Sequence, residues 1–157
     1  MTDTPTPPGR LLPAGIYGCD ALSVGDWIKT PSAQITPAMI DAFADLTGDR
    51  FEIHLTDAAA QRYGFPARVA HGLLVLSVVD GLKYQADATI NGIASLGWEW
   101  TFRRPVLAGD TLHSVITVVG KRATRTPDRG VLRLAVAVIN QDGASVQIGH
   151  NLLMAYR

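Results

Sequence analysis

Residues 72–84 read Gly-Leu-Leu-Val-Leu-Ser-Val-Val-Asp-Gly-Leu-Lys-Tyr, and they form the most apolar helical pattern in the chain. A helix that is apolar nearly all round is normally buried. Four segments rich in Val, Ile, Leu, Trp and Thr follow it, at 90–103, 111–122, 130–140 and 145–156. Turn signals separate these segments, most clearly Gln141-Asp142-Gly143, which is typical of antiparallel strands. We therefore predict an α+β fold in which a curved antiparallel sheet wraps one long central helix.

Two shorter helices are predicted upstream of the apolar one. Thr36 is a good N-cap and Pro37 suits the first helical position, while Gly48 supplies the stop. This pattern places Asp49 on a turn just past the end of the first helix. The second helix is expected to begin at an Asp57 N-cap and to run through Ala58 to Tyr63.

The composition excludes several classes of protein. The chain has 157 residues, with 14 Lys and Arg against 14 Asp and Glu. A domain of this length can bury a core without disulfides or structural metal. The balanced charge argues against a nucleic-acid-binding protein and against a polybasic membrane-surface protein. Charged residues are only 18% of the chain, which suits a protein that hides surface in a homodimer or higher homo-oligomer.

The chain reads as one domain behind a short lead-in. Residues 1–13 are rich in proline and are expected to be a flexible segment, and 14–157 to be a single domain. Cys19 is the one cysteine, so it has no intramolecular disulfide partner. The sequence lacks a signal-peptide layout and an apolar run of membrane-spanning length. We therefore expect a cytoplasmic protein without a membrane partner.

The segment from Asp49 to His54 carries the sharpest chemical signal. A loop can turn these two polar side chains into one pocket while the apolar residues between them, Phe51 and Ile53, anchor it. A carboxylate beside an imidazole forms an acid/base pair near neutral pH. The alternative is that Asp49 caps the next turn and that His54 is an ordinary half-buried histidine.

A second signal is Val69-Ala70-His71-Gly72, which leads directly into the apolar helix. The amides of a first helical turn lack partners, and the helix dipole is positive there, so a carbonyl that gains negative charge fits at Gly72. The alternative is that Gly72 only allows tight packing of the helix start. For His71 we favour a hydrogen-bonded supporting role over a direct one.

Together these features resemble the MaoC-like, or (R)-specific enoyl-CoA hydratase, family of the hotdog fold. The residues that carry the resemblance are Phe43-Ala-Asp-Leu-Thr-Gly-Asp-Arg-Phe-Glu-Ile-His-Leu-Thr-Asp57, Tyr63-Gly-Phe-Pro-Ala-Arg-Val-Ala-His-Gly-Leu-Leu74 and Trp98-Glu-Trp-Thr-Phe-Arg-Arg-Pro-Val-Leu-Ala-Gly-Asp-Thr-Leu112. The likeness covers roughly residues 22–157.

The resemblance implies a hydro-lyase with an acyl-CoA thioester as substrate and no cofactor. No metal is expected either, because Cys19 has no companion and the four histidines show no close paired spacing: His54, His71, His113 and His150. Asp49 and His54 would activate and deliver a water in a reversible syn addition to a trans-2-enoyl-CoA, giving a (3R)-3-hydroxyacyl-CoA. The Gly72 amide would hydrogen-bond the thioester carbonyl. Dimers would join their sheets edge to edge, with the thioester near the interface.

The chain departs from the family pattern at two places. Phe51-Glu52 stands where the family usually has Asn-Pro, and Asp80 stands on the central helix where relatives often carry a small hydroxyl residue. Phe51, Glu52, His71 and Asp80 are the candidates for lining or supporting the pocket, although for Glu52 we favour a side chain that points to solvent or pairs with a nearby arginine. A buried Asp80 would need a partner.

The departures keep two other functions open. One is a hotdog thioesterase, in which a carboxylate activates water against the carbonyl. The other is a non-catalytic acyl-CoA-binding or partner subunit of the same fold. Five cations at strand ends and turns could meet the CoA phosphates: Arg103, Arg104, Lys121, Arg122 and Arg125. Acyl chain length and branching are not determined by any spacing in the sequence.

Overall fold

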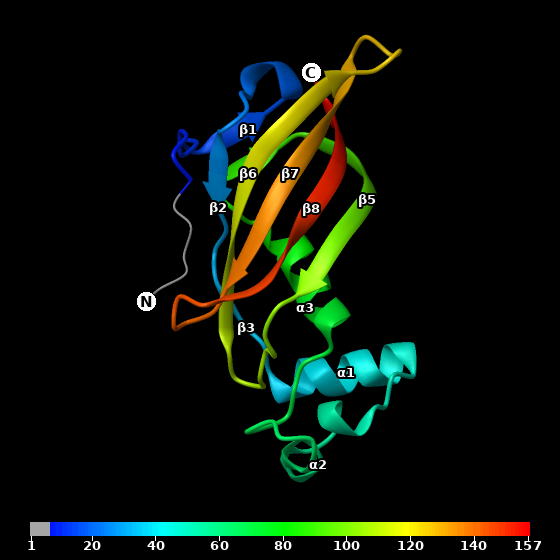
Figure 1. The fold of residues 1–157 in the computed structure, drawn as a ribbon. Coiled ribbons are helices and arrows are strands. Elements are labelled where there is room, and N and C mark those ends of the chain that lie inside the picture. The colour runs from blue at the N-terminus through cyan, green and yellow to red at the C-terminus, as the bar shows by residue number, and fades with distance from the viewer. Residues whose placement is uncertain (1–6) are drawn as a thin grey trace.

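The computed structural model describes residues 7–157, and most of them belong to a curved antiparallel sheet (Figure 1). Its order is β2-β6-β7-β8-β5, and β3 pairs with β6 at the same side as β2. The strands are β2 (Trp27–Lys29), β3 (Ala33–Gln34), β5 (Gly92–Phe102), β6 (Thr111–Ala123), β7 (Arg129–Ile139) and β8 (Ser145–Tyr156). The four long strands confirm the prediction to within a few residues. A separate parallel pair joins β1 (Gly15–Tyr17) to β4 (Ala88–Ile90).

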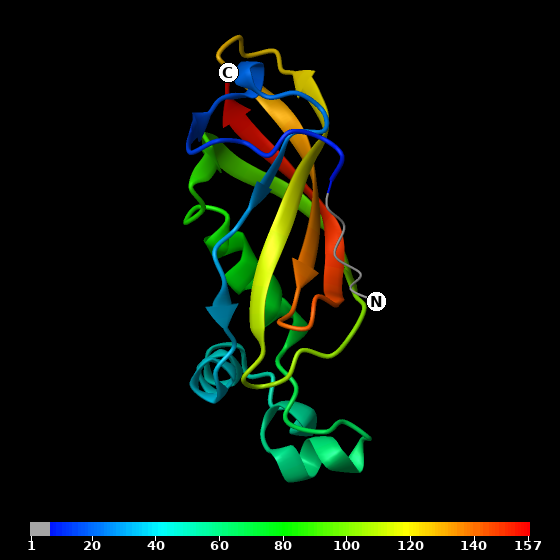
Figure 2. The same cartoon turned by 90° about the vertical axis from the view of Figure 1, so that its left-hand side faces the viewer.

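Among the described residues, three α-helices complete the fold: α1 (Pro37–Thr47), α2 (Asp57–Arg62) and α3 (Gly72–Leu82). Two short 3-10 turns, Cys19–Ala21 and Glu52–His54, lie between the elements. Figures 1 and 2 show α3 lying along one face of the sheet, while α1 and α2 gather beyond one end of it. The predicted α+β arrangement with one central helix is confirmed. Within the described part of the chain, no helix is long and apolar enough to cross a membrane.

The central helix is buried on one side only. Leu74, Val75, Val79 and Leu82 face the core, whereas Leu73 on the opposite side is 59% exposed. The helix also ends at Leu82, earlier than the expected end at Tyr84. The burial expected for this helix therefore applies to the side that faces the sheet, because the sheet curves around only that side.

One edge of the sheet is formed by β5, which pairs with β8 rather than with the next strand in sequence, and the other edge is formed by β2 and β3. After β5 the chain crosses through residues 103–110 to β6, which is separated from β5 in the sheet by β8 and β7. This crossing segment lies beside residues 68–70, since the Ala70 amide donates to Val106 and the Ala108 amide donates to Arg68. It therefore supports the stretch that leads into α3.

The packed part of the chain begins before the boundary that the sequence predicted at Pro13. Arg10 forms a two-pronged ion pair with Asp26, and the Trp27 indole donates to the Gly9 carbonyl. Leu12 is 5% exposed. The first residues of the predicted flexible segment, 1–6, lie outside the described residues.

Candidate active site

The loop after α1 presents Asp49. Thr36 accepts a hydrogen bond from the Met39 amide at the start of this helix, and Gly48 ends the helix with a φ of 76°, in the left-handed region that favours glycine. The chain therefore turns sharply, and Asp49 lies on the turn as predicted. Its carboxylate accepts a bond from the Phe51 amide at 3.3 Å and is otherwise exposed.

His54 lies at the end of a short 3-10 turn, Glu52–His54, and is 8% exposed. Its Nδ1 is 2.7 Å from the Val69 carbonyl oxygen. Because a carbonyl can only accept, Nδ1 carries the proton in the neutral ring and Nε2 is left as an acceptor. The hydrogen bond therefore sets the tautomer that a proton acceptor requires.

His71 stacks on His54, with ring centroids 3.8 Å apart and an angle of 25° between the planes. It is 2% exposed, and its Nε2 donates to the Asp49 backbone carbonyl at 2.9 Å. This bond ties the Asp49 loop to the start of α3. The supporting role expected for His71 stays a prediction.

The electrostatics of the site favour an uncharged His54. Burial lowers the pKa of His54 below its usual value, while the hydrogen bond with Val69 raises it. The neighbouring His71 lowers the pKa further, and the charge of Asp49 opposes that change. The ring is therefore a proton acceptor at neutral pH.

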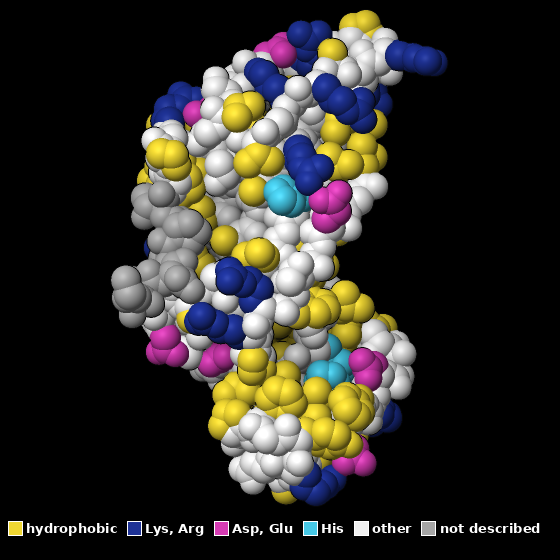
Figure 3. All heavy atoms as spheres, in the orientation of Figure 1, with side chains coloured by type: hydrophobic (Ala, Val, Ile, Leu, Met, Phe, Trp, Pro, Cys, Tyr) yellow, Lys and Arg dark blue, Asp and Glu magenta, His cyan; other side chains and the backbone are white. Residues whose placement is uncertain are grey.

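The structure brings the polar atoms of Asp49, His54 and His71 within 4.8 Å of one another. Two imidazoles and a carboxylate at this spacing could hold a metal ion, and they could equally hold a water molecule by hydrogen bonds. In Figure 3, histidine and acidic side chains meet among hydrophobic side chains in the helical part of the molecule. A polar reaction centre thus lies beside apolar walls.

Gly72 opens α3 and is held from β8. Gln147 donates from Nε2 to the Gly72 carbonyl at 3.2 Å and accepts at Oε1 from the Trp100 indole at 2.8 Å. A Cβ on Gly72 would lie 2.7 Å from the Phe102 ring. Gln147 was not among the predicted site residues, although a glutamine inside the apolar run 145–156 is a signal of a buried polar group.

Of the remaining site candidates, one borders the Asp49–His54 site and two lie away from it. The Phe51 ring contacts both His54 and Tyr63, so it borders the site. Glu52 pairs with Arg62 at 2.6 Å on the surface, as expected for a solvent-facing pair. Asp80 lies more than two helical turns along α3 from Gly72, away from Asp49, and pairs with Lys83.

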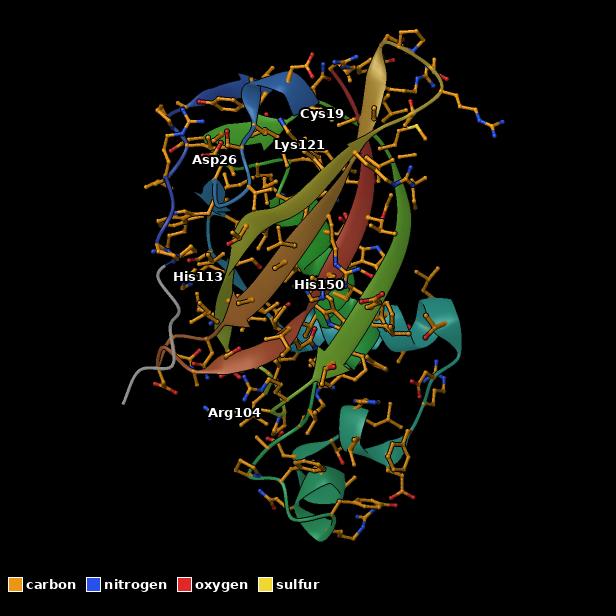
Figure 4. All side chains as sticks on the ribbon, turned by 45° about the horizontal axis from the view of Figure 1, so that its top comes forward. Cys19, Asp26, Arg104, His113, Lys121 and His150 are labelled. Carbon is orange, nitrogen blue, oxygen red and sulfur yellow. The ribbon has the colours of Figure 1, made fainter. Side chains whose placement is uncertain are left out.

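The five candidate CoA cations are not brought together. Arg103 and Arg104 follow β5, near the end that packs on Gly72. Figure 4 shows Arg104 and Lys121 at opposite ends of the sheet. The Lys121 ammonium donates to the Leu22 carbonyl at 2.6 Å, so its role is structural.

Comparison with known proteins agrees with this arrangement. A family model described as "MaoC like domain" matches residues 21–139. The (R)-specific enoyl-CoA hydratase of Aeromonas caviae is 30% identical over 129 residues, which cover 82% of this chain and 92% of that protein. Protein MaoC of Klebsiella aerogenes is 37% identical over 100 residues, but these are 62% of this chain and only 29% of that protein.

The fold is shared with solved structures as well. The MaoC-like dehydratase from Rhodospirillum rubrum superposes with a TM-score of 0.77 at 26% identity, covering 90% of this chain and 97% of that one. The chain therefore belongs to the MaoC-like family and has its hotdog fold.

Proposed function

We propose that the chain is a hydro-lyase that adds water reversibly, in syn fashion, to a trans-2-enoyl-CoA and gives a (3R)-3-hydroxyacyl-CoA. The observation that carries this proposal is that a carboxylate oxygen of Asp49 lies within 4.8 Å of a ring nitrogen of the buried His54, whose Nδ1–H bond to Val69 leaves Nε2 as the proton acceptor. The similarity to an (R)-specific enoyl-CoA hydratase along 92% of that protein supports the substrate class.

One water molecule held between Asp49 and His54 can supply both the hydroxyl group and the proton that are added to the double bond. The carboxylate and Nε2 accept the two hydrogen bonds of this water, and Nε2 takes a proton as the oxygen bonds to the β-carbon. The electron pair of the double bond moves to the thioester oxygen. The resulting enolate is stabilised by the Gly72 amide at the positive end of α3. The pair then returns the proton to the α-carbon from the same face, so one water is added in total.

We also propose that the protein is a homodimer joined along β5. This strand is the long edge of the sheet, whereas the opposite edge consists of the short β2 and β3, and Leu96 and Phe102 on β5 are 47% and 55% exposed. Arg103 and Arg104 follow directly, so a CoA phosphate could be held at the same end of β5. The dimer and the cytoplasmic location stay predictions.

The deciding assay follows the ultraviolet absorbance of the enoyl thioester with a panel of enoyl-CoAs, alongside a free-thiol assay. Loss of absorbance without release of thiol is the expected result. Release of thiol instead would assign a thioesterase, and binding without either change would assign a non-catalytic subunit. Each of these two outcomes contradicts the proposed reaction.

The pH profile tests the state of His54. A protonated ring cannot take the proton from water, so kcat/KM is expected to fall on the acid side as pH drops through the pKa of His54. Because burial lowers this pKa, the acid limb should lie below the ordinary histidine value of about 6.5. His150→Gln, at a half-exposed histidine on β8, is the control and should leave the limb in place. A limb above that value in the unmodified enzyme would contradict the assignment.

A further inference from the structure

The start of α3 differs from the starts of the other two α-helices. A threonine side chain caps α1 and another caps α2, since Thr36 and Thr56 each accept a hydrogen bond from an amide of the first turn. At α3 the N-cap residue is His71, and its side chain makes no capping hydrogen bond. The amides of this first turn are therefore not occupied by a cap, and one of them is the Gly72 amide that the proposed reaction uses.

Gly72 has no side chain that could fix the direction of its amide. The Phe102 ring excludes one, because it lies 2.7 Å from where a Cβ would be, and a glycine rotates about its backbone bonds more freely than any other residue. An oxyanion donor, however, is effective only when its N–H already points at the place where the charge forms. The direction of the Gly72 amide therefore depends on contacts from outside the helix.

One such contact comes from Gln147 on β8. This residue is 2% exposed, and its Nε2 donates to the Gly72 carbonyl at 3.2 Å. In a helix that begins at Gly72, the same carbonyl also accepts from the Leu76 amide. A carbonyl oxygen has two lone pairs, so the bond from Gln147 is a second one and is not needed to satisfy the oxygen. What the bond adds is a fixed direction for the Gly72 backbone.

Trp100 determines which end of the Gln147 amide faces Gly72. The oxygen and nitrogen ends of this amide have nearly the same shape, and turned around it would place its oxygen against the Gly72 carbonyl. An indole N–H can only donate, and that of Trp100 donates to Oε1 at 2.8 Å. The nitrogen end is therefore held toward Gly72. The Trp100 ring itself is fixed by close packing on Gly149, where a Cβ would lie 2.2 Å from it.

Resting on the proposed function, we propose that Gln147 is a positioning residue for the oxyanion donor of the reaction. It acts through Gly72 rather than on the substrate, and Trp100 keeps its amide in the required orientation. A second anchor holds the residue before Gly72, since His71 donates to the Asp49 carbonyl. The peptide group that carries the Gly72 N–H lies between these two anchors, so its direction is set before the thioester arrives.

Gln147→Met removes the donor and should lower kcat for enoyl-CoA hydration about tenfold or more. Loss of a complete oxyanion donor costs about 10²–10³ in kcat, and a misdirected donor loses part of that. KM should change by less than about threefold, because the donor bonds the enolate more strongly than the carbonyl of the bound substrate. If this variant does not fold, Trp100→Phe, which leaves the Gln147 amide free to turn around, should still lower kcat. An unchanged kcat in the folded variant would overturn the proposal.

Gln147→Glu gives a readout that a purely structural role would not move. The introduced carboxyl group donates to the Gly72 carbonyl when it is protonated, whereas its ionised form places an acceptor and a negative charge there. The ratio of kcat in this variant to kcat in the unmodified enzyme should therefore fall as the pH rises. The comparison is made above the acid limb of His54, where that ring is neutral in both proteins. A ratio that is the same at every pH would contradict the positioning role.

Asn151→Asp is the matched control for this measurement. Asn151 is another buried amide on β8, 1% exposed, and its Nδ2 donates to Ser95 and Gly97 on β5 rather than to α3. The change therefore introduces the same chemical group on the same strand without a contact to Gly72. Its kcat ratio to the unmodified enzyme should not vary with pH. The same pH dependence in both variants would overturn the proposal, because any buried carboxyl group on β8 would then produce it.

A spectroscopic measurement separates the role of Gln147 from the hydratase assignment. Saturated acyl-CoAs cannot be hydrated, and the infrared stretch of their thioester carbonyl, isotope-labelled at its carbon, moves to lower frequency when the oxygen accepts a hydrogen bond. The unmodified protein and Asn151→Asp should lower this frequency equally, and Gln147→Met should lower it less. That result supports the positioning role even if no hydration is found. Equal frequencies in the unmodified protein and Gln147→Met overturn the role even if hydration is found.

Discussion

Replacing His54 by alanine is expected to lower kcat for enoyl-CoA hydration by roughly 10²–10⁴-fold, the usual contribution of a positioned acid or base. The variant has no acceptor at the position of Nε2, and the water loses one of its two hydrogen bonds. Asp49→Asn should lower kcat by a similar factor, because a neutral amide neither orients the water in the same way nor stabilises a protonated His54. Both rates are measured by the absorbance assay at saturating substrate.

The matched control for Asp49→Asn is Glu52→Gln, three residues further along the same loop. Glu52 pairs with Arg62 on the surface, so its neutralisation should leave kcat within about twofold, as for other exposed ion pairs. Melting temperatures distinguish lost chemistry from lost folding, since His54 is buried and bonded to Val69. If folded Asp49 and His54 variants hydrate at the rate of the unmodified enzyme, the site assignment is wrong.

The second large effect is a loss of stability, which we expect when Gly149 is replaced by alanine. A Cβ at this position would lie 2.2 Å from the Glu99 carbonyl oxygen and 2.2 Å from the Trp100 ring. The carbonyl belongs to the neighbouring strand, so Gly149→Ala must push β5 away from β8. Overpacking of this kind costs about 1–3 kcal/mol, and the upper end applies because backbone has to move. Urea denaturation measures this loss of the free energy of unfolding.

Gly81→Ala is the matched control. Nothing lies within 4 Å of a Cβ on Gly81, and its position in α3 makes alanine the better helix former. Its free energy of unfolding should stay the same or rise by up to about 1 kcal/mol. The Gly149→Ala variant should also lose activity, because the Trp100 indole donates a hydrogen bond to Gln147, and Gln147 donates one to the Gly72 carbonyl. Equal stability of the two variants would contradict the register of β5 against β8.

Much of the fold could be predicted from local patterns. The long strands and the apolar helix can be recognised from the periodic spacing of their own apolar side chains. Thr36 and Gly48 mark the two ends of α1, because one caps its start and the other allows the turn at its end. The short strands β1, β2, β3 and β4 were not predicted, because a segment of two or three residues is too short to show a periodic spacing of apolar side chains. The neighbour of β5 was not predicted either, since strand order depends on where the 103–110 crossing packs.

The same distinction applies to the candidate site, where the sequence predicted some features and gave no signal for others. The five-residue step from Asp49 to His54 predicts an acid/base pair, and the structure brings the two side chains together. The tautomer of His54 depends on Val69, and the anchor of Gly72 depends on Gln147, which comes from a distant strand. Sequence spacing contains no signal for either contact. Asp80 was a candidate by position, but its partner Lys83 was missed.

The sequence by itself determined the helices and the four long strands, the family resemblance and the residues that can exchange a proton, because each depends on side chains that are near one another along the chain. Only the tertiary structure decided what each group touches. Contacts between distant segments set the hydrogen-bond partner of His54, the burial that lowers its pKa and the bond from Gln147 to Gly72. Burial and partnership are properties of packing, so they emerge only when α3, β5 and the Asp49 loop meet.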